Sequence, residues 1–186
     1  MNTPLIKITG FILLCLFQWI LPVSWILQEE KTRTEGIFVK IPCRPFDPAD
    51  PFRGTFLNIQ PLPAEFDYED SSRFENQQEV WVNYIPDSGE IYRFHSVQPL
   101  SEAPAQPVHF KVTIRNTYVQ GPGAQYTAFL DYPFSKYFIS EKEAPRLAEK
   151  YNQALSDTTQ TVYAGLFVLD GNASLDGIWI GAEKLE

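Results

Sequence analysis

The stretch "VHFKVTIR" at residues 108–115 alternates apolar and polar side chains without a break. The apolar positions are Val108, Phe110, Val112 and Ile114, and the polar positions between them are His109, Lys111, Thr113 and Arg115. Successive side chains of a β-strand point to opposite faces of a sheet, so this period of two predicts a strand with one face in the core and the other toward water.

Further strand signals lie on both sides of this stretch. Runs rich in β-branched and aromatic residues, which favour strands, occupy 37–41, 55–59, 79–85, 90–97, 125–132, 161–169 and 173–180. The sequence "PDSG" at 86–89 predicts a hairpin turn, and Asp170-Gly171 is a tight-turn pair between the last two strands. Residues 65–78 are expected to form a polar loop. Strands joined by such short turns pair antiparallel.

One helical pattern interrupts the strands. Ser140 and Glu143 have the spacing of a capping box, which marks the start of a helix. Pro145 stands late for a first turn, so the helix is expected to restart or kink there. The residues on one helical face, at spacings of three and four, are Ala144, Leu147, Ala148, Tyr151 and Leu155. The predicted fold class is α+β, a mostly antiparallel β domain with one or two short helices, preceded by a single N-terminal transmembrane helix.

The N-terminal run "ITGFILLCLFQWILPVSWIL" at residues 8–27 carries no charged side chain. A helix over this range is roughly 30 Å long, which matches the hydrocarbon thickness of a bilayer. A buried core helix would be expected to carry charge on one face. A cleaved signal has a shorter apolar region, of about 7 to 15 residues, and a small-residue cleavage site, which "LPVSW" does not resemble. We interpret residues 1–27 as an uncleaved signal anchor, with a cleaved signal as the alternative.

The rest of the chain divides into a short polar linker at 28–36 and one β-rich domain at 37–186. The basic start at Lys7 followed by an apolar run is typical of an export signal. The positive charges after the run do not favour a cytoplasmic N-terminus, but long domains translocate largely regardless of charge. We therefore expect the β-rich domain outside the cytoplasm.

Composition argues against several kinds of chemistry. The formal net charge of -8 disfavours binding to nucleic acid, which requires clustered Lys and Arg. Cys15 and Cys43 lie far apart, so no disulfide between them is expected, and Cys43 is predicted to be a small loop residue rather than a nucleophile. His95 and His109 lack neighbouring ligands, so no metal or cofactor is predicted. A non-enzymatic protein is the preferred interpretation.

The segment "CRPFDPADPFRGTFLNIQP" at 43–61 places prolines at 45, 48 and 51. Each proline fixes its own φ and keeps the preceding residue extended, which predicts a rigid loop. In polyproline II geometry Asp47, Asp50 and Arg53 share one edge, and Gly54 tolerates a positive φ where the chain turns into the next strand. Two interpretations stay open: a turn that only fixes strand register, or an edge presented for recognition.

This segment resembles the start of the bacterial GDYXXLXY protein family. The motif's Gly corresponds to Gly54, its first Tyr to Phe56 and its Leu to Ile59. Thr55 stands where the motif has Asp, and Pro61 where it has the final Tyr. Any role of that carboxylate or that hydroxyl is therefore absent from this chain.

The resemblance extends over nearly the whole chain, since residues 131–151, residues 156–180 and the apolar N-terminus recur in the same order in the family. It implies a membrane-anchored bacterial protein. Together with the topology expected above, this predicts a single-pass protein of the bacterial inner (cytoplasmic) membrane, with its domain on the extracytoplasmic, periplasmic side. The resemblance also implies a multi-pass membrane protein as partner, because members are often encoded beside such proteins. The family has no established activity.

The segment "YFISE" at 137–141 resembles another recurrent element of the family. Glu141 stands where the predicted helix begins, a position that favours a carboxylate, and the guanidinium of Arg53 is suited to pairing with one. Our hypothesis is that the proline-rich loop and this helix start lie side by side, with Arg53 held by an acidic residue. The predicted recognition residues are Asp47, Asp50, Arg53, Gly54, Tyr137, Phe138 and Glu141.

The leading functional interpretation is an envelope protein without catalytic activity, whose β domain binds a partner or serves another membrane protein as an accessory module. One alternative is a hydrolase with a β domain like that of signal peptidase. That enzyme needs a Ser and Lys pair, and this chain has no Ser in the corresponding stretch. The other alternative is a domain that binds a small or lipidic ligand in a β pocket.

Overall fold

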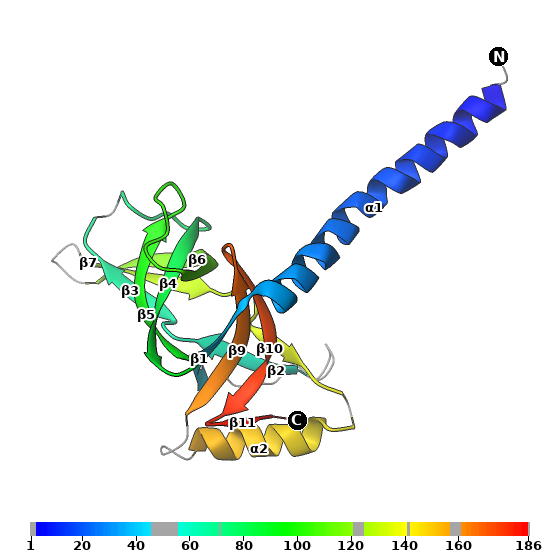
Figure 1. The fold of residues 1–186 in the computed structure, drawn as a ribbon. Helices are drawn as coiled ribbons and strands as arrows, with labels where there is room; N and C mark the ends of the chain where they lie inside the picture. Colours follow the sequence, from blue (N-terminus) through cyan, green and yellow to red (C-terminus); the bar gives the residue numbers. More distant parts are fainter. Residues whose placement is uncertain are drawn as a thin grey trace.

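The computed structural model describes residues 3–45, 56–70, 72–120, 125–140, 142–156 and 161–185. Figure 1 shows a long N-terminal helix that projects from a β-rich domain. In chain order the elements are α1 (Thr3–Glu35), β1 (Ile37–Pro45), β2 (Phe56–Pro61), β3 (Glu65–Tyr68), β4 (Glu79–Ser88), β5 (Ile91–Pro99), β6 (Val108–Gln120), β7 (Gln125–Asp131), β8 (Lys136–Phe138), α2 (Ala144–Ser156), β9 (Val162–Leu169), β10 (Asn172–Ile180) and β11 (Glu183–Lys184). The predicted fold class, an apolar helix followed by a mostly antiparallel β domain with one short helix, is confirmed.

The described strands form one mixed sheet in the order β11-β10-β9-β1-β5-β4-β6-β7-β3. β2 pairs with β1 outside this path, and β8 pairs with β2. The paired strands are antiparallel except β1 and β5, which run parallel and meet at Lys40 and Ile91. Long-range pairing of this kind cannot be inferred from local patterns, so the sheet order is new information.

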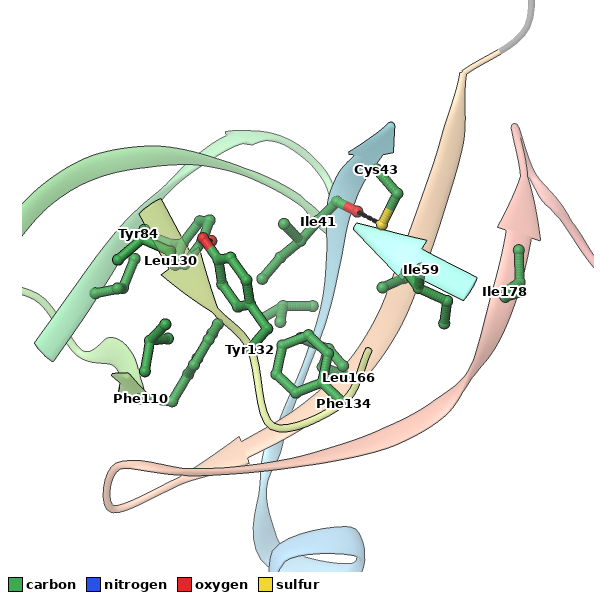
Figure 2. Packing of buried hydrophobic residues seen from close by; sticks show 14 of the residues in the cluster. Ile41, Cys43, Ile59, Tyr84, Phe110, Leu130, Tyr132, Phe134, Leu166 and Ile178 are labelled. Carbon is green, nitrogen blue, oxygen red and sulfur yellow. Dashed lines mark hydrogen bonds between the residues drawn. The ribbon is translucent and has the colours of Figure 1, made fainter. Parts of the chain in front are cut away.

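The alternation at 108–115 is confirmed in β6, because Val108, Phe110, Val112 and Ile114 are all buried. The alternation ends at a bulge between Ile114 and Asn116, opposite β7. Phe110 stacks on Tyr84 of β4, with ring centroids 5.3 Å apart. Figure 2 shows this part of the core, where Tyr84, Phe110 and Phe134 surround the ring of Tyr132. Aromatic burial on this scale is a large part of the stabilising apolar area.

Two of the predicted boundaries in the β domain are wrong. Residues 65–78 are not all loop, since Glu65–Tyr68 forms β3 at one end of the sheet order. Phe66 and Tyr68 each pack edge-on against Phe74, with centroids 5.2 Å apart. The hairpin turn also lies later than "PDSG" suggests. β4 continues to Ser88, and Gly89 supplies the positive φ of 57° that the turn requires.

The predicted helix near residue 140 starts later than its capping box suggests. The first helical hydrogen bond runs from the Leu147 N–H to the Glu143 carbonyl at 2.9 Å, so α2 begins at Ala144. Pro145 therefore lies in the first turn, where proline is tolerated, and it neither restarts nor kinks the helix. Leu147 and Tyr151 are buried, as the predicted apolar face requires.

Helix α1 is long and apolar enough to cross a membrane, with a mean hydropathy of 2.0 in its most apolar stretch, and a signal sequence fits the same description. The polar segment 28–36, expected as a linker, continues this helix to Glu35. The end of α1 is bonded to the sheet. Arg33 donates to the Ser174 hydroxyl at 3.0 Å and to the Leu175 carbonyl at 3.1 Å, and Ser174 donates to the Glu29 carboxylate.

The predicted turn at Asp170-Gly171 is confirmed. Both residues have positive φ, 47° and 80°, as a two-residue hairpin turn of the primed type requires. A Cβ on Gly171 would lie 2.6 Å from the Trp81 ring. The turn also contacts β6, because the Lys111 N–H donates to the Gly171 carbonyl at 3.2 Å.

We expect Gly171→Ala to lower the free energy of unfolding by more than the roughly 1 to 3 kcal/mol that a positive φ alone costs a side chain, because the new methyl group also meets Trp81. The matched control is Gly181→Ala, where φ is +58° and nothing lies within 4 Å of the added carbon. Denaturant unfolding of both purified variants measures the difference. Equal losses for the two would show that Trp81 does not restrict this turn.

Candidate functional site

The structure describes two of the seven predicted recognition residues. Tyr137 and Phe138 lie in β8, which the sequence did not predict as a strand. The other five, Asp47, Asp50, Arg53, Gly54 and Glu141, lie outside the described residues. Their contacts stay predictions.

The pairing of β2 with β8 brings distant parts of the chain together. Phe56, the first described residue after the proline-rich loop, pairs with Phe138, and Leu57 pairs with Tyr137. The loop that precedes Phe56 and the segment that follows Phe138 are therefore attached to neighbouring points of the sheet. The pairing is consistent with the hypothesis that the loop and the start of α2 are neighbours.

An exposed aromatic surface forms at this pair. The rings of Phe56 and Phe138 lie 5.9 Å apart, and the Lys136 Nζ lies 4.9 Å from the centre of the Phe56 ring. Phe138 is 69% exposed, which is unusual for a large apolar side chain. Aromatic side chains are enriched at protein interfaces and often act as anchors there. We name Phe56, Lys136 and Phe138 the β2–β8 surface. Tyr137, between the last two in β8, faces the other way and packs against the core.

A small cleft of about 180 Å³ lies against the other end of β2. It is lined by Ile59, Gln60, Pro61, Arg115, Leu130, Asp131, Tyr132 and Ser135. The Ile59 N–H donates to the Ser135 carbonyl at 2.9 Å, which joins β2 to the segment before β8. Arg115 and Asp131 are exposed, so the rim of the cleft offers one positive and one negative group.

Two buried tyrosines lie at this cleft: Tyr132 lines it, and Tyr84 lies behind Tyr132. The Tyr84 hydroxyl is 3.1 Å from that of Tyr132, and the carbonyls of Leu62 and Pro63 accept from them at 3.0 and 2.8 Å. Burial raises the pKa of both hydroxyls above the ordinary value for tyrosine. Both side chains therefore stay protonated at neutral pH and act as hydrogen-bond donors, not as bases.

Cys43 is a buried residue of β1, which corrects its prediction as a loop residue. Its thiol lies 3.4 Å from the Ile41 carbonyl oxygen, and Figure 2 shows the sulfur directed toward that oxygen. Burial raises the pKa of the thiol from 9.0 to about 12. A thiol in this state is not a nucleophile at neutral pH, since the thiolate is the reactive form.

The described titratable groups also offer little for metal binding. Among the residues that the structure describes, no three His, Cys, Asp or Glu side chains are placed to hold an ion. The His109 Nδ1 lies 2.7 Å from the Gln106 carbonyl oxygen, and the ring packs edge-on against Trp81. His95 stands at a bulge of β5 between residues that pair with Asn83 and Tyr84.

A larger cleft of about 470 Å³ lies between the base of α1 and the sheet. Trp25, Gln28 and Glu29 of the helix line one side, and Lys111 and Asp131 of the sheet line the other. Asp131 also lines the small cleft beside β2. The end of β7 therefore lies between β2 and the base of the apolar helix.

Comparison with known proteins identifies the family. A sequence model of the GDYXXLXY protein family matches residues 18–178. The chain belongs to the GDYXXLXY family. No curated protein and no solved structure matches it significantly. The family match begins inside α1, so the second half of the apolar helix and its joint with the sheet both lie within the shared region.

Most of the GDYXXLXY motif positions lie in β2, and their side chains differ in burial. Ile59 and Pro61 are buried, whereas Phe56 is partly exposed on the β2–β8 surface. Ile59 lines the small cleft and also belongs to the core. The described part of the motif therefore contributes to the core at its C-terminal end and has a partly exposed aromatic ring at its start.

No pattern in the sequence places Arg115 and Asp131 at the same cleft. Arg115 was predicted only as a polar position of a strand, and the bulge after Ile114 shifts the pairing with β7 at that point. Bulges redirect side chains locally. They leave no regular pattern in a single sequence, so these two residues could be found only from the structure.

We expect stability to fall as pH rises above about 9, and Cys43→Ala to reduce that fall. The thiol keeps its proton in the folded state up to about pH 12 but loses it near 9.0 in the unfolded chain, so above pH 9 the folded state binds more protons. The free energy of unfolding then decreases with pH by up to about 1.4 kcal/mol per unit.

Urea titrations between pH 8 and 10 measure this dependence. Cys15→Ala serves as the matched control, because it leaves Cys43 in place and should keep the parental slope. An unchanged slope in Cys43→Ala would contradict the burial of the thiol.

Proposed function

We propose that this chain is a single-pass envelope protein of the bacterial inner membrane, whose β domain binds a partner close to the bilayer and has no catalytic role. The observation that carries the proposal is the unbroken α1. Its apolar stretch runs directly into a polar end that Glu29 and Arg33 bond to β10. The β domain is thereby held in a fixed position relative to the apolar stretch.

The length of α1 places the domain near the membrane. If residues 8–27 span the hydrocarbon core, the eight residues from Gln28 to Glu35 extend roughly 12 Å further. The polar headgroup layer on one side of a bilayer is about 5 to 8 Å thick, because the whole bilayer measures about 40 to 45 Å and its core about 30 Å. The end of α1 therefore lies only a few ångström beyond the headgroups. A partner of this domain is therefore itself in the membrane or at its surface, and a multi-pass membrane protein fits this requirement.

The β2–β8 surface is the best described place for such a partner to bind. It presents Phe138, 69% exposed, together with Phe56 and the positive charge of Lys136. The predicted recognition residues of the proline-rich loop, Asp47, Asp50, Arg53 and Gly54, precede Phe56 in the chain, and Glu141 follows Phe138. We propose that these residues extend the same surface.

The two alternative functions have less support. The cleft beside β2 measures about 180 Å³, whereas small-molecule pockets measure about 300 to 1,000 Å³. The cleft of about 470 Å³ at the base of α1 is within this range, but Gln28, Glu29, Lys111 and Asp131 line it, so it is not an apolar pocket for a lipidic ligand. Hydrolysis needs an activated nucleophile. The Cys43 thiol is held protonated by burial. Binding of a protein partner agrees better with an exposed aromatic surface than with either alternative.

We expect the protein to stay in the membrane fraction after carbonate extraction, because a spanning helix is not released by high pH as a peripheral protein is. A periplasmic reporter fused after Glu186 should be active, and a cytoplasmic reporter at the same position should be inactive. Activity of the cytoplasmic reporter would contradict the proposed orientation. Release of a shortened protein into the soluble fraction would identify a cleaved signal instead.

We expect a photo-crosslinking amino acid at position 138 to form a specific adduct with a membrane protein in intact cells. Phe138→Ala and Arg53→Ala should each reduce recovery of that protein by about tenfold or more, which corresponds to roughly 1.4 kcal/mol or more for an interface anchor. Tyr118→Ala is the matched control, because Tyr118 is also an exposed aromatic residue, at 54%, but lies in β6. Equal recovery with all variants would remove the β2–β8 surface from the proposal.

A further inference from the structure

The two outer strands of a five-strand part of the sheet, β5 and β3, line one groove. In the order β5-β4-β6-β7-β3, the strands β5 and β3 are separated by three others. Nevertheless a groove of about 860 Å³ is lined by Glu65, Phe66 and Asp67 of β3 and by Phe94, His95 and Ser96 of β5. The sheet therefore curls until its edge strand faces β5 across an open groove.

The edge of β3 offers backbone hydrogen-bonding groups to this groove. In an antiparallel pair, successive residues direct their N–H and C=O groups alternately toward the partner strand and away from it. The Leu130 N–H donates to the Ala64 carbonyl at 2.9 Å, and the register continues with Phe66 opposite Ala128. Glu65 and Asp67 therefore direct their backbone groups away from β7. Within the part of the chain that the structure describes, no strand pairs with that edge.

β5 has a similar edge. It pairs with β4 along its length. On its other side, its described pairing is with β1 at a single position, Lys40 opposite Ile91. The stretch from Phe94 to Ser96, which lines the groove, lies beyond this contact. Both walls of the groove thus consist of strand edges that pair with no other described strand along the groove.

The side chains of β3 at the groove are acidic on one face of the strand and aromatic on the other. Four carboxylates line the groove, those of Glu65, Asp67, Glu69 and Asp70. Asp67 is held in place by the Thr127 hydroxyl at 2.7 Å. The Ser72 N–H and hydroxyl keep the pKa of Asp70 below its ordinary value, so this carboxylate stays charged.

Most of the positive charge at the groove is neutralised. Arg73 pairs with Glu102 at 3.7 Å and lies over the ring of Phe74. Phe66, Tyr68 and Phe74 form an edge-to-face cluster at the groove. An occupant therefore meets apolar rings on one face and carboxylates on the other, a pattern that alternates with the period of a strand.

We propose that the groove between β3 and β5 binds an extended, basic segment of another protein, which adds to the sheet as a strand beside β3. Backbone hydrogen bonds to Glu65 and Asp67 hold the segment. Its alternate side chains are Lys or Arg, facing the carboxylates, and apolar residues, facing the aromatic cluster. Addition of a strand to a free sheet edge is a known mode of peptide recognition.

Charge selects against a second copy of this chain as the occupant. The chain has a formal net charge of -8, and pairing of two β3 edges would place the carboxylates of Glu65 and Asp67 against those of the other copy. Like charges opposite each other destabilise paired strands. The groove lies apart from the β2–β8 surface, so this inference goes beyond the proposed function and does not depend on it.

The test uses the full chain in nanodiscs of zwitterionic lipid and a fluorescent seven-residue peptide of alternating Lys and Val. Fluorescence anisotropy should show saturable binding that weakens as salt is added, since the attraction is partly screened. Hydrogen exchange should slow at residues 65–68 when the peptide is present. A peptide with Glu in place of Lys, and one with Pro at its centre, should each bind about fivefold more weakly or worse.

Glu65→Pro removes a backbone donor from the free edge without removing a bond to β7, and it should weaken binding of the Lys-Val peptide about fivefold or more. Glu65→Gln keeps that donor and should weaken binding less. If Glu65→Pro does not fold, as judged by circular dichroism, the exchange data on the parental chain decide the matter. Equal binding of the three peptides, binding to empty nanodiscs alone, or no slowing of exchange in β3 would each overturn the proposal. Dimers of the chain that the peptide fails to dissociate would overturn it in favour of a second copy.

Discussion

The backbone pairing of β1 is the constraint on which the rest of the structure depends. β1 pairs antiparallel with β9 from Ile37 to Pro42, meets β5 in parallel at Lys40, and pairs antiparallel with β2 from Cys43 to Pro45. Val39, Ile41 and Cys43 place their side chains in the core. A slip of one residue would turn these side chains outward and direct Lys40, Pro42 and Arg44 into the core. This one strand therefore fixes the positions of α1, the motif strand β2 and the curled part of the sheet.

The opposite face of β1 is held by a buried cation, Lys40. The Lys40 Nζ lies 3.8 Å from the centre of a Trp179 ring and 3.1 Å from a Glu90 carboxylate oxygen. Gly165 leaves the space that the Trp179 side chain occupies, since a Cβ there would collide with the indole. A cation on an aromatic face is stabilised most where water is excluded. Lys40 thus connects three strands, β1, β10 and the start of β5, on the side of the sheet away from the core.

What could be predicted from the sequence was local. The alternation at 108–115 and the Asp170-Gly171 turn each depend on neighbouring residues, and both are present as predicted. β3 and β8 were missed because they span only four and three residues, too few to show a period. The pairing of β2 with β8 and the groove between β3 and β5 depend on contacts between distant segments. A single sequence carries no direct record of such contacts, so the β2–β8 surface could be predicted only in part, through Phe138. Tyr137, predicted with it, packs against the core instead.

The absence of a flexible segment between α1 and β1 has a mechanical consequence. Gly36 separates the helix from the strand, and its N–H still donates to the Thr32 carbonyl at 3.0 Å. Together with the bonds from Arg33 to β10, this makes the helix and the sheet turn as one body. In a membrane, a partner that rotated the helix about its axis would swing the sheet through the same angle. Each residue inserted between the apolar stretch and Arg33 would likewise change the direction in which the sheet faces by about 100°. The helical phase of α1, as well as its hydrophobicity, thus determines which surface the domain presents to its surroundings.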